Sequence, residues 1–276
     1  MKLADLFDVR GHVAIVTGAA SGLGLAYAEV MALNGATVVM TDVNAATLDE
    51  HVARLRGEGG AVEGVPLDVS DARALQAVID GAAERHGRLD CLFANAGVSG
   101  GLGTLVSQDG AVDRFDLAIY QRAVDINLTA TLMAMRFAVP HMKRRRSGSI
   151  VITASIAGMR AEQMCGYGYV AAKAAVINVA RQAAVELAPH NIRVNAIAPG
   201  PFLTNIGDGR LKKQPELQKL FTDMVPLGRM AQPDEIKGLA LLLASPAGGY
   251  ITGAVIPIDG GATCVSSRSH YTLPSG

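Results

Sequence analysis

Short runs of apolar, mostly β-branched residues alternate along this chain with longer segments of helical periodicity, and this alternation limits the possible folds more than any other feature. The runs that predict strands lie at 12–17, 36–41, 61–67, 89–94, 149–154, 192–198 and 254–258. The segments that predict helices lie at 23–34, 45–56, 71–86, 117–143, 168–188 and 234–244. Because the strands are apolar along their whole length, both faces of the sheet must be covered. The sequence therefore predicts an α/β fold with a doubly wound, seven-stranded parallel sheet and helices on both faces.

The chain is expected to form a single domain over residues 1–276, because no linker, composition break or internal repeat divides it. Half of the residues are hydrophobic, which is enough for one large core. Two regions lack periodicity: the glycine-rich stretch 97–110 predicts an exposed loop, and the stretch 201–228 is polar and irregular. Residues 262–276 predict a polar C-terminal tail outside the regular elements.

The first predicted strand runs directly into the sequence Thr17-Gly18-Ala19-Ala20-Ser21-Gly22-Leu23-Gly24, and a predicted helix follows. Glycines at such a junction let the backbone approach a pyrophosphate, whose negative charge then faces the positive end of the helix. The spacing GxxxGxG differs from the GxGxxG fingerprint, and such a run could also be an ordinary strand-to-helix turn. Its position after the first strand favours a dinucleotide site, with contacts from Gly18, Ser21, Gly22, Leu23 and Gly24.

Asp42 stands at the end of the second predicted strand, 18 residues after Gly24. A carboxylate there can accept hydrogen bonds from the ribose hydroxyls of an adenosine, and it would repel a 2′-phosphate. Two charges about 4 Å apart at an effective dielectric near 20 interact by about 4 kcal/mol, and half of that still gives more than a tenfold preference. Because no Arg or Lys lies within 18–24 or 41–46, we expect NAD (NADH) rather than NADP. Asp42 could instead merely end a strand.

Polar and small residues follow two further strands, at the edge of the sheet where a cofactor crevice is expected. Asp68 and Val69 follow the third strand, and Asn95, Ala96 and Gly97 follow the fourth. We expect both groups to contact the cofactor. Asp68 could equally cap the helix that follows it.

A tyrosine and a lysine lie four residues apart in the sequence Tyr169-Val170-Ala171-Ala172-Lys173, which places both side chains on one face of a predicted helix. Ser155 follows the fifth predicted strand, 14 residues before Tyr169, and Asn127 lies in the middle of the preceding helix. Taken with the glycine run, Asn95-Ala96-Gly97, Pro199-Gly200, Thr204 and the closing Asp259-Gly260-Gly261, the chain resembles the short-chain dehydrogenase/reductase family. These proteins are tyrosine-dependent oxidoreductases with a Rossmann-type fold, and the resemblance covers roughly residues 8–262.

The resemblance implies a catalytic tetrad of Asn127, Ser155, Tyr169 and Lys173. In the family, Asn127 would accompany a helix distortion and a water that relays protons from Lys173 to solvent. The cofactor contacts that the resemblance adds are Tyr169, Lys173, Ile197, Pro199, Gly200 and Thr204.

The chemistry of these side chains agrees with that implication. Reduction of a ketone needs a proton donor at the oxygen, and oxidation of the alcohol needs a base. A phenol with a pKa near 10 is a poor base at neutral pH, and a neighbouring ammonium such as Lys173 would lower that pKa. Ser155 would donate a hydrogen bond to the reacting oxygen. Tyr167 has no lysine four residues later, so it is a pocket wall or a packing residue, and Cys165 is expected to be a pocket-lining or buried thiol.

Composition excludes several other classes of protein. Lys and Arg total 25 and so do Asp and Glu, which argues against a nucleic-acid partner or an acidic lipid surface. The three cysteines are dispersed and form no ligand cluster with His or Glu, so we expect neither disulfides nor a metal site. The charged N-terminus and the absence of about 18 uninterrupted apolar residues predict no membrane span and a cytoplasmic location.

The substrate would be set by residues 98–116, 159–168 and 201–228, the last being the expected substrate-covering segment. These stretches are largely apolar, which favours a hydrophobic secondary alcohol or ketone, although the same residues could cover the core. The alternatives are an NADPH-dependent 3-oxoacyl-(acyl-carrier-protein) reductase and, less favoured, a non-catalytic NAD-binding protein. The resemblance also implies a homotetramer, or a homodimer, packed through the last strand and two apolar helices. The helix residues concerned are Leu132, Met133, Met135, Phe137, Val176, Ile177, Val179 and Ala180.

Overall fold

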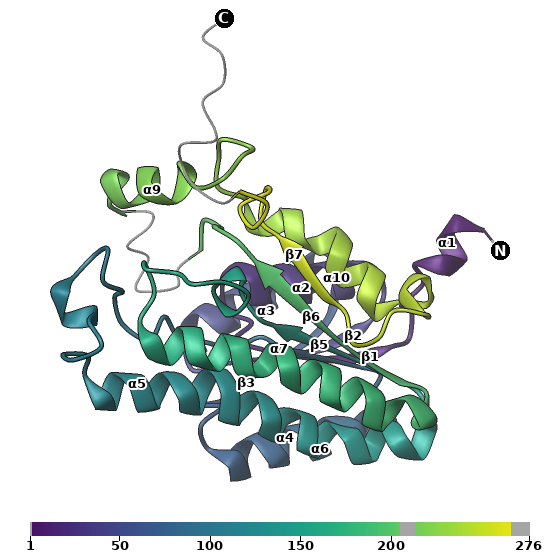
Figure 1. Cartoon of the computed structure of the whole chain (residues 1–276). Coiled ribbons are helices and arrows are strands. Elements are labelled where there is room, and N and C mark those ends of the chain that lie inside the picture. Colours follow the sequence, from purple (N-terminus) through teal and green to yellow (C-terminus); the bar gives the residue numbers. More distant parts are fainter. Residues whose placement is uncertain (1, 205–212, 266–276) are drawn as a thin grey trace, which may run out of the picture.

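The computed structural model describes residues 2–204 and 213–265 as one seven-stranded sheet covered by helices, as the sequence predicts (Figure 1). The strands are β1 (Val13–Thr17), β2 (Thr37–Asp42), β3 (Ala61–Pro66), β4 (Cys91–Ala94), β5 (Gly148–Thr153), β6 (Ile192–Pro199) and β7 (Val255–Ile258). All neighbouring strands are parallel. Residues 205–212 of the expected substrate-covering segment and residues 266–276 of the expected tail lie outside the described residues.

The helices occupy the predicted segments, with local differences at their ends. The α-helices are α1 (Leu3–Leu6), α2 (Gly22–Leu33), α3 (Ala45–Gly57), α4 (Ala72–His86), α5 (Leu117–Val124), α6 (Ala130–Arg145), α7 (Tyr167–Leu187), α9 (Pro215–Thr222) and α10 (Lys237–Ala244). Shorter turns are η1 (Gln108–Gly110), η2 (Asp125–Thr129), η3 (Ile156–Gly158), η4 (Ala188–His190), η5 (Pro233–Ile236) and η6 (Pro246–Gly248). None of these helices, within the described ranges, is long and apolar enough to cross a membrane.

The helices form two layers around the sheet. Figure 1 shows α4, α5, α6 and α7 over one face, and α2, α3 and α10 over the other. Each face has its own core: Leu75, Ile79 and Met142 belong to the first, and Tyr27, Met31 and Leu48 to the second. Tyr27 stacks on Phe93 of β4, with ring centroids 5.0 Å apart.

The strand order is β3-β2-β1-β4-β5-β6-β7, so the chain moves outward in one direction from β1 and in the other direction from β4. In an open parallel sheet, the point where the order reverses leaves a crevice at the carboxyl ends of the two central strands. The predicted site residues at the ends of β1, β2 and β4 therefore meet at one edge.

Two predicted helices differ from expectation in an informative way. The predicted helix 117–143 is divided by η2, a π-helical turn that contains Asn127. The predicted helix 234–244 begins with the 3₁₀ turn η5 and becomes α-helical only at Lys237. Inserting a π turn changes which side of the helix the following side chains occupy, so the hydrophobic period alone does not reveal it.

Candidate active site

The glycine-rich turn between β1 and α2 has a backbone conformation that only glycine adopts easily. Gly18 and Gly22 have φ angles of +68° and +56°. A Cβ atom on Gly18 would lie 2.9 Å from the Cα of Ala96, and one on Gly24 would lie 2.0 Å from the carbonyl oxygen of Gly18. The turn is therefore packed directly against the end of β4, and the amino end of α2 faces the crevice.

Asp42 is held at the rim of this turn by two backbone amides. Its Oδ2 accepts a hydrogen bond from the N–H of Ala20 at 3.0 Å, and its Oδ1 accepts one from the N–H of Asn44 at 2.9 Å. Each carboxylate oxygen has a second lone pair. The side chain is thus fixed in place while it can still accept hydrogen bonds from a ribose.

Asn95 ties three strands together beneath the crevice. Its Nδ2 donates to the carbonyls of Thr17 and Gly18 at 3.0 and 3.2 Å, and its Oδ1 accepts from the hydroxyl of Thr153 at 3.0 Å. The hydroxyl of Thr17 in turn accepts from the backbone N–H groups of Asn95 and Ala96. The sequence reasoning missed Thr17 and Thr153, since a threonine at a strand end carries no signal beyond β propensity.

Asn127 lies in the π-helical turn and is 1% exposed. Its Nδ2 donates to the carbonyls of Ala123 at 2.9 Å and Val98 at 3.0 Å, and its Oδ1 accepts from the N–H of Val98 at 3.3 Å. A Cβ on Gly97 would lie 2.6 Å from that Oδ1. The structure therefore has the helix distortion expected around Asn127 and uses the side chain to fix the loop after β4.

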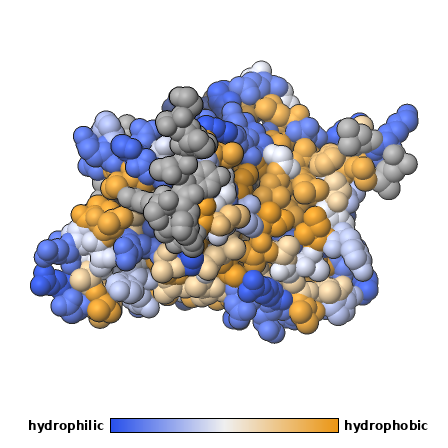
Figure 2. Space-filling model, turned by 45° about the horizontal axis from the view of Figure 1, so that its top comes forward, coloured by the Kyte–Doolittle hydropathy of each residue, from blue (hydrophilic) through white to orange (hydrophobic). Residues whose placement is uncertain are grey.

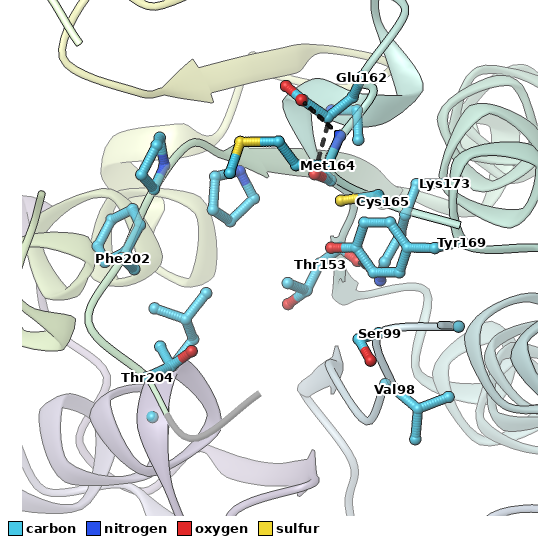
Figure 3. A pocket seen from close by; sticks show the side chains of 18 of the residues that line it. Val98, Ser99, Thr153, Glu162, Met164, Cys165, Tyr169, Lys173, Phe202 and Thr204 are labelled. Carbon is cyan, nitrogen blue, oxygen red and sulfur yellow. Dashed lines mark hydrogen bonds between the residues drawn. The ribbon is translucent and has the colours of Figure 1, made fainter. Parts of the chain in front are cut away.

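Ser155, Tyr169 and Lys173 all line the other side of the crevice. Figure 3 shows Tyr169 and Lys173 next to each other. Ser155 precedes η3, accepts a hydrogen bond from the N–H of Ala157 at 3.1 Å, and its hydroxyl is close enough to Tyr169 to lower the pKa of the phenol slightly. Lys173 is 4% exposed, and its ammonium donates to the carbonyl of Thr153 at 2.7 Å. The same ammonium lies 5.6 Å from the centre of the Tyr169 ring.

Burial controls the acidity of both titratable groups. Burial raises the pKa of Tyr169, the charge that Cys165 can carry raises it further, and the hydrogen bond with Ser155 lowers it by less. Burial also lowers the pKa of Lys173 to about 8. The pKa of Tyr169 is therefore raised and not lowered as expected, because burial is the largest cause and Lys173 is not among the groups that shift it.

All these groups surround one cavity of about 670 Å³, which lies within the usual range of about 300–1,000 Å³ for ligand pockets. The predicted residues that line it are Gly18, Ser21, Gly22, Leu23, Asp42, Asn95, Ala96, Gly97, Ser155, Tyr169, Lys173, Pro199, Gly200 and Thr204. Gly24 and Asn127 do not line the cavity. Gly24 packs against the carbonyl of Gly18, and Asn127 fixes the loop after β4 through its hydrogen bonds with Val98.

Asp68, Val69 and Ile197 also lie outside the cavity lining. Asp68 is exposed, and its Oδ1 accepts from the hydroxyl and the N–H of Ser70 at 2.7 and 2.9 Å, which lowers its pKa. Asp68 therefore caps a turn, and the helix capping that the sequence left open for it is made by Asp71, whose side chain accepts from the N–H groups of Arg73 and Ala74. Ile197 is fully buried in β6. Contact between these three residues and a cofactor stays a prediction.

The remaining walls of the cavity come from loops that the motifs do not constrain. They contribute mainly apolar side chains, namely Val98, Leu102, Val106, Ile119, Met164, Phe202, Leu217, Phe221 and Met224. Cys165 lines the cavity, and burial raises the pKa of its thiol to about 12, so it stays protonated. Tyr167 is a packing residue: it is 45% exposed and its ring lies 5.6 Å from that of Phe115. The charged residues Arg122 and Glu162 also line the cavity, and no sequence motif indicated them.

The shape and the donors of this cavity suit a nicotinamide dinucleotide. The backbone of the glycine turn can approach a pyrophosphate because no Cβ stands at Gly18 or Gly22. Asp42 is placed to accept from a ribose, and Lys173 is close enough to Tyr169 to serve both a ribose and the phenol. No group of three potential metal ligands occurs among residues 2–204 and 213–265.

Comparison with known proteins supports this geometry. Residues 18–263 match the protein family described as enoyl-(acyl carrier protein) reductase. The chain is 38% identical to cis-4-hydroxycyclohexanecarboxylate dehydrogenase of Sinomonas cyclohexanicum, over 92% of this chain and 97% of that one. A solved short-chain dehydrogenase/reductase from Mycobacterium marinum superposes with a TM-score of 0.87 at 33% identity, covering 96% and 100% of the two chains. This protein belongs to the short-chain dehydrogenase/reductase family.

Other similar proteins differ from one another in the substrate or the cofactor that their names give. The chain is 35% identical to a 3-oxoacyl-(acyl-carrier-protein) reductase of Thermotoga maritima, over 92% and 98% of the two chains. Among similar solved structures, a 7α-hydroxysteroid dehydrogenase (31% identity, TM-score 0.85, covering 95% and 98% of the two chains) is complexed with NADH. A protein from Beutenbergia cavernae (30% identity, TM-score 0.86, covering 94% and 100%) holds NADP. The family thus establishes an oxidoreductase that uses a nicotinamide cofactor.

Proposed function

We propose that this protein is an NAD-dependent dehydrogenase that interconverts a hydrophobic secondary alcohol and the corresponding ketone. The observation that carries the proposal is a single cavity whose lining brings Ser155, Tyr169 and Lys173 together opposite the glycine turn and Asp42. This arrangement would bring a proton donor and acceptor within reach of a substrate oxygen if a cofactor lies along the edge of the sheet.

The chain's own residues would handle the proton and position the substrate. The nicotinamide, when bound, supplies or accepts the hydride. Tyr169 would donate its phenolic proton to the oxygen during reduction and remove the hydroxyl proton during oxidation. Ser155 would donate a hydrogen bond to the same oxygen, which stabilises the negative charge that develops there. Lys173, anchored on the Thr153 carbonyl, would hold a positive charge beside the phenol.

The preference for NAD over NADP follows from Asp42. Its carboxylate is fixed by Ala20 and Asn44 at the end of β2, where a 2′-phosphate would have to enter. Arg122 is a cation in the cavity lining, and its charge acts on Asp68 at the end of β3. We infer that the charge of Asp42 outweighs that of Arg122 at the adenosine ribose. Repulsion between Asp42 and a 2′-phosphate would then disfavour NADP by at least about tenfold.

The proposed substrate class follows from the apolar walls. Leu217, Phe221 and Met224 line the cavity from α9 and the loop after it, which supports a substrate-covering role for the segment 201–228. Leu102 and Val106 line it from the loop after β4. Such a surface stabilises an apolar ring or chain by removing it from water.

The proposal is tested by absorbance at 340 nm, with NAD and then NADP, across a panel of hydrophobic secondary alcohols. The control is the variant Tyr169→Phe, which keeps the ring and removes the acid. We expect turnover with NAD in the wild type and a loss of roughly 100-fold or more in the variant. Undiminished turnover by Tyr169→Phe would contradict the assigned role, and tight NAD binding without turnover of any alcohol would favour a non-catalytic protein.

One second candidate has specific support. The family description and the Thermotoga maritima relative both point to reduction of acyl groups on a carrier protein. Such an enzyme would use NADPH and would reduce 3-oxoacyl thioesters. A clear preference for NADPH with an acetoacetyl thioester, over NADH with cyclic ketones, would establish that candidate instead.

We also propose that the protein assembles as a homotetramer or a homodimer. Figure 2 shows apolar side chains gathered over the edge of the molecule formed by β7 and α10. Partly buried apolar residues of these elements and the loop between them include Leu239, Leu241, Ile251, Ile256 and Ile258. Of the helix residues expected at the interface, Met135, Val176, Ile177 and Ala180 are instead buried in the core of the chain. Helices α6 and α7 still present Leu132 and Val185, which are 37% and 77% exposed. Sedimentation that shows only monomer at micromolar concentration would contradict this.

A further inference from the structure

We propose that Glu162 selects the substrate: its carboxylate favours neutral alcohols that carry a second hydroxyl group and disfavours substrates that carry a carboxylate. The inference rests on the proposed function, since it concerns the same cavity. Glu162 lies in the loop between η3 and α7, and it is the acidic side chain on the substrate side of the described cavity lining.

The position of Glu162 is fixed by contacts within its own loop. Its side chain is only 8% exposed, although it lines the cavity. Oε1 accepts a hydrogen bond from the N–H of Met164 at 3.2 Å, and Oε2 lies 3.7 Å from an Nη atom of Arg160. A carboxylate can accept about four hydrogen bonds, so these two partners leave acceptor positions for a ligand.

Arg160 does not turn this site into a receptor for anions. Its guanidinium is outside the cavity lining, and its other Nη atom donates to the carbonyl of Ala262 in the turn after β7. Arg160 therefore joins the loop between η3 and α7 to the turn after β7, and it contacts Glu162 from outside the cavity lining.

The other charged groups of the cavity lie away from Glu162. Asp42 stands at the glycine turn, and Arg122 acts on Asp68 at the end of β3. Lys173 lies behind the Tyr169 ring, with its ammonium on the Thr153 carbonyl. The cation paired with Glu162 is Arg160, which lies outside the cavity lining, so a carboxylate on a substrate would meet the carboxylate of Glu162 on the cavity side of that pair.

The negative charge of Glu162 acts towards the reacting end of the cavity. In Figure 3, Cys165 is drawn between Glu162 and Tyr169. Glu162 contributes to the raised pKa of the Cys165 thiol, which shows that its charge is felt at Cys165, and Cys165 and Tyr169 both line the cavity. A substrate whose alcohol oxygen reaches Tyr169 therefore extends past Cys165 and Met164, two apolar neighbours, towards one strong acceptor. A hydroxyl there gains a charge-assisted hydrogen bond, whereas a carboxylate is repelled.

The test compares the wild type with Glu162→Gln, which keeps an acceptor for the Met164 N–H and removes the charge. Glu216→Gln is the matched control, since Glu216 is an exposed glutamate of α9 outside the cavity lining. Each protein is assayed with NAD on cyclohexanol, the three positional isomers of cyclohexanediol, and hydroxycyclohexanecarboxylate. In the wild type we expect kcat/KM for the best diol to exceed that for cyclohexanol by roughly tenfold.

In Glu162→Gln we expect that advantage to disappear and kcat/KM for the hydroxy acid to rise by roughly tenfold, with cyclohexanol changed by less than about twofold. A wild type that oxidises the hydroxy acid as well as cyclohexanol, or a Glu162→Gln variant with unchanged ratios, would overturn the inference while leaving the proposed function intact.

A binding measurement keeps the two proposals separable if no alcohol is turned over. Calorimetric titration of the NADH-bound proteins with cyclohexanecarboxylate should show binding to Glu162→Gln that is roughly tenfold tighter than to the wild type. Equal affinities would refute the role of Glu162, whatever the turnover assays show.

Discussion

The buried charge of Lys173 lowers the free energy of unfolding at neutral pH, so a substitution that removes this charge should raise it. The side chain is 4% exposed, and burial lowers its pKa from 10.5 to about 8. A displacement of this size corresponds to about 3 kcal/mol of lost stability at neutral pH, where the ammonium is charged in both the folded and the unfolded chain. In Lys173→Met, a flexible side chain of similar length fills the space without a charge, while the Thr153 carbonyl loses its donor at a cost of about 1–2 kcal/mol.

The sign of the difference in stability between Lys173→Met and the wild type should change with pH. Between pH 8 and 10.5 the unfolded chain still binds the Lys173 proton and the folded chain does not, so wild-type stability rises with pH in that window. Lys173→Met should therefore be more stable than the wild type at pH 7, by about 1–2 kcal/mol, or about 3 °C in Tm. Above roughly pH 9–10 it should become less stable, because only the lost hydrogen bond remains.

The assay is urea unfolding followed by circular dichroism at pH 7 and pH 10, at one fixed protein concentration because assembly affects apparent stability. Lys143→Met is the matched control, since Lys143 is partly exposed and lies 3.6 Å from Glu186 on the surface. The control should show no crossing of the two stability curves. A Lys173→Met variant that is less stable at pH 7, or a difference that stays constant up to pH 10, would refute the reasoning.

Three further predictions follow from contacts in the site. Asp42→Asn keeps an acceptor and removes the charge, so the ratio of kcat/KM for NADP to that for NAD, measured at 340 nm, should rise at least about tenfold. Gly24→Ala places a Cβ 2.0 Å from the carbonyl of Gly18 and should weaken NADH binding in a fluorescence titration by more than about tenfold. Gly57→Ala, with nothing within 4 Å, should bind NADH normally. Asn127→Ala removes three hydrogen bonds from a residue 1% exposed and should lower the free energy of unfolding in urea by about 2–4 kcal/mol. A loss below about 0.5 kcal/mol would contradict the bracing role of Asn127.

The fold was predictable because its signals are local. Apolar strands bounded by glycine and asparagine, and helices begun by residues such as Asp71, whose side chain accepts from the N–H groups of Arg73 and Ala74, are visible within short windows. The π-helical turn around Asn127 is not visible in such a window, because it is stabilised by contacts with Val98 from another part of the chain, and only the family resemblance predicted a distortion there. The short helix α1 (Leu3–Leu6) lies in a part of the sequence that shows no periodic pattern.

The geometry of the glycine turn and of Asp42 was predictable for a similar reason, whereas the pKa values of the buried groups were not. Glycine spacing and the residue at a strand end translate directly into backbone geometry, as Gly18 and Asp42 show. The pKa of Tyr169 depends on how much water remains around it, and the sequence predicts its neighbours without predicting their hydration. Burial therefore reversed the direction that the pairing with Lys173 suggested.

The substrate end is built in a way that makes narrow specificity the expected outcome. The stretch 97–110 reads as an exposed loop, yet it is joined to the loop before α7 by a bridge between Leu102 and Cys165. A Cβ on Gly103 would lie 2.2 Å from the carbonyl oxygen of Gln163, and one on Gly166 would lie equally close to that of Gly100. Two loops in such contact cannot move apart without losing backbone hydrogen bonds, including that from Gly103 to Met164. The cavity wall that carries Glu162 is thus held in place before a substrate binds. The Glu162 carboxylate therefore cannot move away from an unsuitable ligand, and we expect the fixed loops to make its effect on substrate selection strong.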